Sequence, residues 1–335
     1  MPPKSRSRRP WRLSRLDDLA SGVGRRQSYP FGGCCFRLPP DVPISEFMIL
    51  AAPGCRITVT REIILAHARA LPASPQVLAG VCELLQDINT GLSEISAEIR
   101  LEAALAARVI RISNSPVFGN GRRIGSVDEA VNRVGFAEVF RLVGAATVAG
   151  LVDRSLSCYS VPADRLREAL LFHALASEAL AEATSLDPRM AYSAGLLRAI
   201  GMMVLDREGR SKMDASGAFD LRKFERYTGW EVLRFGMRST EVTAMILNDW
   251  RFPPVIVDAL QAHLLLDEAS YHNRLACVLN LAGAIIAEYG LALPGEAACW
   301  KFSEEKCAAA GITVAQFHAA SANAFSRFEK QRSTL

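Results

Sequence analysis

The chain has 335 residues, half of them apolar, so it can bury the core of one large domain or two modest ones. No apolar run reaches the roughly 18 residues that a transmembrane helix needs, which argues against a membrane span. The net charge of +4 is unevenly distributed: residues 1–30 hold eight basic and two acidic residues, and the rest of the chain carries a net charge of −2. This negative balance argues against a folded core that binds nucleic acid.

Residues 1–50 are predicted to be a disordered basic tail, because the first 47 are rich in Pro, Arg, Ser and Gly and lack sustained periodicity. The tail has three interpretations: a basic arm for nucleic acid or an acidic membrane surface, an unstructured extension, or sequence upstream of a true start at Met48. No apolar signal-peptide core follows the basic start, and the eight cysteines form no Cys-x-x-Cys pair. We therefore expect a cytoplasmic protein with reduced thiols.

Residues 55–152 are predicted to form a helical half, since alanine and leucine dominate and β-branched alternation is scarce. Helices are expected at 57–70 and 75–88. The next helix is predicted as one continuous segment over 92–112, because its apolar residues recur at three- and four-residue intervals. Asn114, Ser115 and Pro116 then end it, since proline lacks the N–H that a further turn needs.

A helical hairpin is predicted over 127–151. Ser126 and Glu129 have the spacing of a capping box, which begins the first helix. Gly135 is the expected pivot, and the small apolar residues after it indicate a helix buried on most sides.

Residues 153–290 are predicted to form a second helical half, and one or two closing helices are expected within 291–335. The polar, Gly-containing stretch 206–219 is expected to be a surface loop. The predicted helices of the second half are 164–184, 187–205, 219–228, 229–235, 239–251, 255–266 and 272–289.

Three stretches of the first half carry a resemblance to a known family. They are Leu71-Pro72-x-x-Pro75, Leu105-Ala106-Ala107-Arg108-Val109-Ile110-Arg111-Ile112-Ser113-Asn114-Ser115 and Ile124-x-Ser126-Val127-x-x-Ala130-Val131-x-x-Val134-Gly135. These stretches resemble the HDOD family, the bacterial HD-related output domains, which are all-helical relatives of the HD metal-dependent phosphohydrolases. The resemblance extends to about residue 290. It implies an all-α fold in which 55–152 packs on a degenerate HD-like bundle, 153–290.

One departure from the family pattern occurs at Glu102-Ala103, where many members have Asp-Pro. Both pairs suit the first part of a helix, so we expect the fold to be unchanged.

The HD hydrolases take their name from an adjacent His-Asp pair that binds divalent metal together with an upstream His and a downstream Asp. The metal lowers the pKa of a bound water, which then attacks phosphorus. Where the wider family has a Gly-Leu-Leu-His-Asp-Ile-Gly-like segment, this chain has Gly195-Leu196-Leu197-Arg198-Ala199-Ile200-Gly201. Arg198 stays protonated and cannot ligate a metal, and Ala199 has no ligand atom. We therefore expect no catalytic residue, no metal and no cofactor.

His173 matches the upstream HD histidine, and His263 follows a motif that resembles other HDOD proteins. With Arg198 and Ala199 they define a vestigial pocket. The two histidines are interpreted as buried remnants of the ancestral site, as a weak metal site, or as a sensor of pH or ligand. An Arg198 side chain that points into this pocket would make an anion the more attractive occupant.

A second candidate site is the loop after the third predicted helix, with Asn114, Ser115, Arg122 and Arg123. The two guanidinium groups could meet an anion such as a nucleotide phosphate. A solvated loop, with Ser115 serving as a helix-end residue, is the alternative.

The resemblance implies a role in bacterial signal transduction. We expect a non-catalytic regulatory module that binds a signalling protein, for example a cyclic-dinucleotide or two-component system protein, and the sequence leaves open a small ligand in the vestigial pocket. The alternative is a divergent metal-dependent phosphohydrolase acting on a nucleotide or cyclic dinucleotide, with Asp206 or Asp249 as replacement ligands. A third interpretation, nucleic-acid binding through residues 1–30, predicts affinity that falls steeply with salt.

Overall fold

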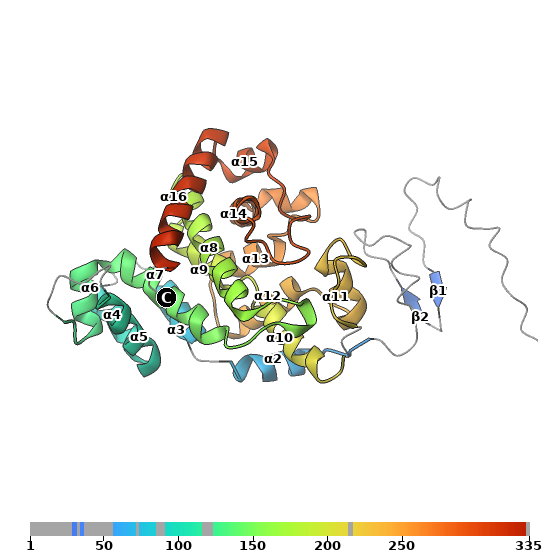
Figure 1. The fold of residues 1–335 in the computed structure, drawn as a ribbon, viewed down its shortest axis with the longest axis horizontal. Coiled ribbons are helices and arrows are strands. Elements are labelled where there is room, and N and C mark those ends of the chain that lie inside the picture. The colour runs from blue at the N-terminus through green and yellow to red at the C-terminus, as the bar shows by residue number, and fades with distance from the viewer. Residues whose placement is uncertain are drawn as a thin grey trace, which may run out of the picture. The chain divides into compact units, whose positions relative to one another are not determined.

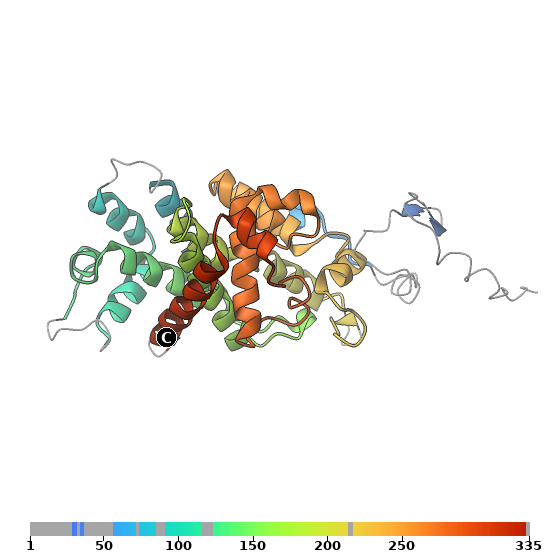
Figure 2. The same cartoon turned by 90° about the horizontal axis from the view of Figure 1, so that it is seen from above.

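The structure is a computed structural model that describes residues 29–31, 34–36, 56–71, 74–84, 91–115, 123–213 and 217–332 (Figures 1 and 2). It divides into two units, Met1–Val42 and Pro43–Leu335. In the first unit, β1 (Tyr29–Phe31) pairs antiparallel with β2 (Cys34–Phe36). The rest of the predicted basic tail lies outside the described residues, so its disorder stays a prediction. No helix of the described segments is long and apolar enough to cross a membrane.

The second unit is helical, which confirms the predicted fold class. Its first half contains α2 (Arg61–Arg69), α3 (Ser74–Leu84), α4 (Leu92–Arg100), α5 (Ala103–Ser113), α6 (Val127–Val134) and α7 (Phe136–Leu151). Its second half and closing segment contain η2 (Ser157–Tyr159), α8 (Ala163–Ala181), α9 (Pro188–Leu197), α10 (Ile200–Arg210), α11 (Tyr227–Phe235), α12 (Ser239–Asp249), α13 (Pro254–Ala262), η4 (Glu268–His272), α14 (Arg274–Glu288), α15 (Glu304–Ala310) and α16 (Val314–Arg332).

The central helix is α8, which packs against α9, α14 and α16; Figures 1 and 2 both show the red α16 lying along it. Most of its residues are buried, because neighbouring helices cover it on several sides. The first half joins this bundle through α7, which contacts α8 and α9, and through α2, which contacts α10 and α12. The Tyr192 hydroxyl on α9 donates a hydrogen bond of 2.8 Å to the carbonyl of Arg141 on α7.

The hairpin of α6 and α7 is confirmed. The Ser126 hydroxyl accepts a hydrogen bond of 3.1 Å from the Glu129 amide, as the capping pattern predicts. Gly135 ends α6 and begins α7 with φ 85°, in the left-handed region that favours glycine. The chain can therefore reverse at this one residue.

Three predicted elements of the second half are wrong, and one of them, the single helix over 187–205, is broken at Arg198 and Ala199. The helix expected at 219–228 is a series of turns, in which the Asp220 carboxylate accepts from the Arg222 amide at 3.0 Å; such local bonds compete with helix formation. The loop expected at 206–219 begins too early, because α10 continues to Arg210.

The continuous helix predicted over 92–112 is also wrong, because the structure breaks it into α4 and α5. Glu102 is the N-cap of α5, with extended backbone (φ −113°, ψ 105°), and Ala103 is the first helical residue. Its side chain makes no capping hydrogen bond. Leu101 and Ala104 continue the apolar spacing across the break, although both are exposed in the structure, so periodicity alone could not locate the break.

This break lies at the Glu102-Ala103 pair, where the sequence departs from the pattern of the family that it resembles, and it gives a prediction. In the double variant Glu102→Asp/Ala103→Pro, aspartate is the better N-cap, and proline suits a first helical position whose preceding residue is extended. We expect the free energy of unfolding, measured with urea, to rise by about 1 kcal/mol. Ala107→Pro, one turn later in α5, should instead lower it by about 3 kcal/mol. A double variant that is less stable than the parent would contradict the capping argument.

Candidate functional site

The segment that resembles the HD motif, residues 195–201, lies at a break between helices. A single helix over 187–205 was predicted, but α9 ends at Leu197 and α10 begins at Ile200, with Arg198 and Ala199 between them. The Gly201 amide donates a hydrogen bond of 3.1 Å to the Thr243 hydroxyl of α12. This tertiary bond takes an amide that a continuous helix would use internally, and the Arg198 side chain turns into the bundle.

Arg198 is 3 % exposed and forms an ion pair with Glu296, which is fully buried. The second guanidinium nitrogen lies 3.4 Å from the other carboxylate oxygen. The Arg198 guanidinium carbon also lies 4.6 Å from the centroid of the Trp300 ring, in the geometry of a cation–π contact. The cation at the HD position is therefore matched by a carboxylate and an aromatic ring of the same chain.

The two predicted pocket histidines lie beside this ion pair. His173 is fully buried on α8, its ring 5.5 Å from that of Trp300. His263 is 2 % exposed and donates from Nδ1 to the Leu260 carbonyl at 2.7 Å. Burial, and then the charge of Arg198, hold the pKa of His173 well below its ordinary value. Burial also lowers the pKa of His263 to about 4, with a smaller contribution from Arg198, so both rings are neutral at pH 7.

A hydrogen-bond network around Lys306 and Asn280 lies next to the ion pair and the two histidines. The Lys306 ammonium on α15 donates to Asn280 Oδ1 at 2.8 Å and to the Lys301 carbonyl at 2.7 Å. The Asn280 amide in turn donates to the His263 carbonyl at 2.9 Å. The end of α13 is thus tied to the closing segment of the chain through α14.

Sequence reasoning missed four residues of this region. Glu296 and Trp300 lie in a non-helical stretch before α15, and Asn280 and Lys306 lie on neighbouring helices. Their only sequence signal is that Glu296 is a charged residue among small ones; Lys306 directly follows Glu304 and Glu305 and does not stand out. Nothing in the local pattern indicates that they meet Arg198 or His263.

The residues present do not fit the metal site of an HD hydrolase. Within the described ranges, no three His, Cys, Asp or Glu side chains come close enough to hold a metal ion. The Asp206 carboxylate is engaged by the Cys158 amide and by Arg210, each at 2.7 Å. Asp249 is exposed at the end of α12. The structure therefore brings neither replacement carboxylate together with the two histidines in a metal-binding group.

The family is decided by comparison with known proteins. The model of the HDOD domain matches residues 71–265, which is more than half of the chain. The chain belongs to the HDOD family. Comparison with curated proteins gave no match.

Solved structures share the fold of this HDOD protein. A provisionally named phosphohydrolase from Shewanella amazonensis SB2B is 22% identical with a TM-score of 0.57, and the match covers 81% of this chain and 97% of that one. An HDOD domain protein of unknown function from Geobacter sulfurreducens is 19% identical with a TM-score of 0.57, covering 82% and 96%. A provisionally named signal transduction protein from Marinobacter aquaeolei VT8 is 18% identical with a TM-score of 0.60, covering 86% and 64%. At these identities the likeness shows the fold alone.

The second predicted site lies only partly among the described residues of this HDOD protein. The Asn114 amide donates to the carbonyls of Ile110 at 3.0 Å and Ile124 at 2.9 Å, and its oxygen accepts from the Ile124 amide at 2.7 Å. Asn114 therefore joins the two ends of the loop. Ser115 is half-buried, Arg123 is exposed, and Arg122 lies outside the described residues. An anion-binding role for this loop stays a prediction.

His263 should make the stability of the HDOD unit depend on pH. Its pKa is about 4 in the folded protein and 6.5 as an ordinary histidine, so the unfolded chain takes up the proton first as the pH falls. The free energy of unfolding should therefore fall between pH 6.5 and 4, by about 3 kcal/mol for a shift of this size. His263→Gln should remove this part of the slope in urea titrations across that range. The control His318→Gln, at an exposed position, should keep it; parallel curves for the parent and His263→Gln would contradict the assignment.

Proposed function

We propose that this HDOD protein is a non-catalytic regulatory module of bacterial signal transduction that acts by binding a protein partner. The observation that carries the proposal is the buried ion pair of Arg198 with Glu296 at the position of the HD pair. A guanidinium group does not ligate metals, and its charge opposes a divalent cation at short range. The activated water that HD hydrolases use has no support from these residues.

The same ion pair disfavours a small ligand in the vestigial pocket. Glu296 and Trp300 pack against Arg198 and His173, so a ligand at the histidines would have to displace them. Displacement would leave a buried charge without its partner, which is costly. We therefore place recognition at the surface of the domain, with a two-component or cyclic-dinucleotide signalling protein as the expected partner.

The test uses the full chain purified from cells grown with manganese and iron. Elemental mass spectrometry should find far less than one transition metal per chain, and bis-p-nitrophenyl phosphate should not be hydrolysed above the rate of buffer with added Mn²⁺. A stoichiometric metal, with hydrolysis that disappears in His173→Ala/His263→Ala, would overturn the proposal and favour the phosphohydrolase alternative.

The regulatory part is tested by pairwise interaction assays against the response regulators and cyclic-dinucleotide enzymes of the source bacterium. No interaction with any of them would count against the regulatory part.

A further inference from the structure

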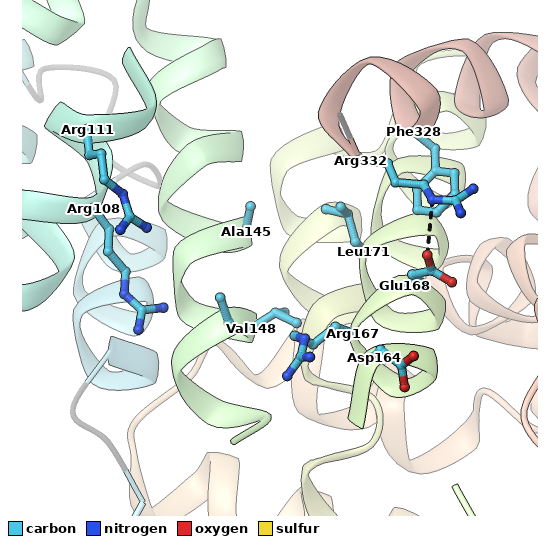
Figure 3. Close-up of a pocket in the computed structure, with 11 residues that line it drawn as sticks. Arg108, Arg111, Ala145, Val148, Asp164, Arg167, Glu168, Leu171, Phe328 and Arg332 are labelled. Carbon is cyan, nitrogen blue, oxygen red and sulfur yellow. Dashed lines mark ion pairs between the residues drawn. The ribbon is translucent and has the colours of Figure 1, made fainter. Parts of the chain in front are cut away.

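A cleft of about 540 Å³ lies over α7, away from the vestigial pocket (Figure 3). Its floor is the small apolar surface of α7, with Ala145, Val148 and Ala149. Arg108 and Arg111 of α5 form one wall, and the first turns of α8 with the end of α16 form the other. The cleft is thus lined by both halves of the HDOD unit.

The charges of this cleft are unbalanced. Four arginines line it, against two carboxylates on α8, Asp164 and Glu168. Glu168 is paired with Arg332 of α16 at 3.1 Å, the dashed line in Figure 3. The other three arginines, Arg108, Arg111 and Arg167, form no ion pair among the described residues.

None of these three arginines has a counter-charge among the described side chains, and Arg111 is exposed. Arg108 is half-buried, and within the described ranges its guanidinium donates to a single acceptor, the Ala146 carbonyl on α7, at 3.3 Å. Arg167 likewise donates to a carbonyl, that of Val152, at 2.7 Å. Carbonyls satisfy hydrogen bonds but do not neutralise charge, so these guanidinium groups keep a positive potential in the cleft. An anion bound between these guanidinium groups would lower the positive potential.

We propose that this cleft binds a small phosphorylated molecule of nucleotide size. Arginine binds phosphate through paired N–H donors, and here such donors approach from opposite walls. The volume lies within the range of small-molecule sites, about 300–1,000 Å³, and the apolar floor suits a flat or apolar body. Asp164 and Glu168 disfavour a long acidic peptide running the length of the cleft. This site goes beyond the proposed function, because it would give the module a ligand input at a place distinct from the HD remnant.

The test is isothermal titration of the full chain with ATP as the nucleotide probe and inorganic pyrophosphate as a second probe. We expect saturable binding of one ATP per chain. The variant Arg108→Gln/Arg111→Gln, and separately Arg167→Gln, should weaken it by at least about tenfold, as the loss of one charge-assisted pair predicts. The matched control is Arg222→Gln, an exposed arginine paired with Asp220 outside the cleft, and it should bind like the parent.

A second variant separates binding from folding. Ala149→Phe leaves every arginine in place and puts a ring on the half-buried floor of the cleft, so it should abolish ATP binding while circular dichroism stays unchanged. Absence of binding by both probes, or unchanged affinity in the arginine variants or in Ala149→Phe, would overturn the cleft proposal. An equal loss in Arg222→Gln would also overturn it, as non-specific charge attraction. Turnover of the titrated ATP would instead count against the proposed non-catalytic function and leave the cleft assignment standing.

Discussion

Replacing Glu296 by alanine is expected to lower the free energy of unfolding by about 3–5 kcal/mol, the usual cost of removing one partner of a buried ion pair. Glu296 is fully buried and Arg198 is 3 % exposed, so the remaining guanidinium would stay in a low-dielectric interior without a counter-charge. The carboxylate also accepts the Leu293 amide at 2.9 Å, which adds a second unsatisfied group. Urea unfolding followed by tryptophan fluorescence measures the change.

Two controls separate the charge from the packing. Glu305→Ala, at an exposed position of α15, should change stability by less than about 0.5 kcal/mol. In Arg198→Met/Glu296→Leu both charges are replaced by apolar groups of similar length, and stability should return close to that of the parent. A loss below about 1 kcal/mol in Glu296→Ala would mean that Arg198 reaches water, and the account of the vestigial pocket would then be wrong.

Gly201→Ala is the second substitution with a large expected effect. A Cβ at this position would overlap the backbone carbonyl oxygen of Ser239 and lie 2.7 Å from the Thr243 hydroxyl oxygen. Backbone cannot rotate away as a side chain can, so α10 would have to move from α12 and weaken the bond that turns the chain at Arg198. We expect a loss of about 3 kcal/mol in thermal or urea unfolding, at the upper end of overpacking costs.

The matched control is Gly125→Ala, where the nearest atom to an added Cβ, Glu129 Oε2, lies at 3.8 Å. It should remain within about 0.5 kcal/mol of the parent. If both glycine variants were equally stable, α10 and α12 would be further apart at Gly201 than the structure shows, and the packing argument would be wrong.

The vestigial pocket shows how far sequence reasoning could reach. The change at Arg198 and Ala199 is visible in seven consecutive residues, because the scaffold on both sides matches the HD pattern. The identity of residue 198 also predicted that an anion would occupy the pocket if the Arg198 side chain pointed into it. The side chain does so, but the anion that it meets there is Glu296, 98 residues further along the chain. A partner at that distance leaves no trace in a local pattern.

The cleft over α7 shows the same limit. In the sequence, Arg108 and Arg111 stood out only as members of one stretch that resembles the family. They line one cleft with Arg167 because α5 and α8 lie on either side of α7, as Figure 3 shows. This arrangement depends on how three helices pack and not on the propensity of any one of them.

The sequence by itself determined the helical class, the HDOD resemblance and the hairpin at Gly135, since each depends on residues within a few turns of one another. Only the tertiary structure decided the breaks at Glu102 and at Arg198–Ala199, because the apolar spacing in the sequence continues across both of them. It alone also decided the partner of Arg198. A buried charge is stabilised by an opposite charge that is close in space, and that charge can come from any part of the chain that packs beside it.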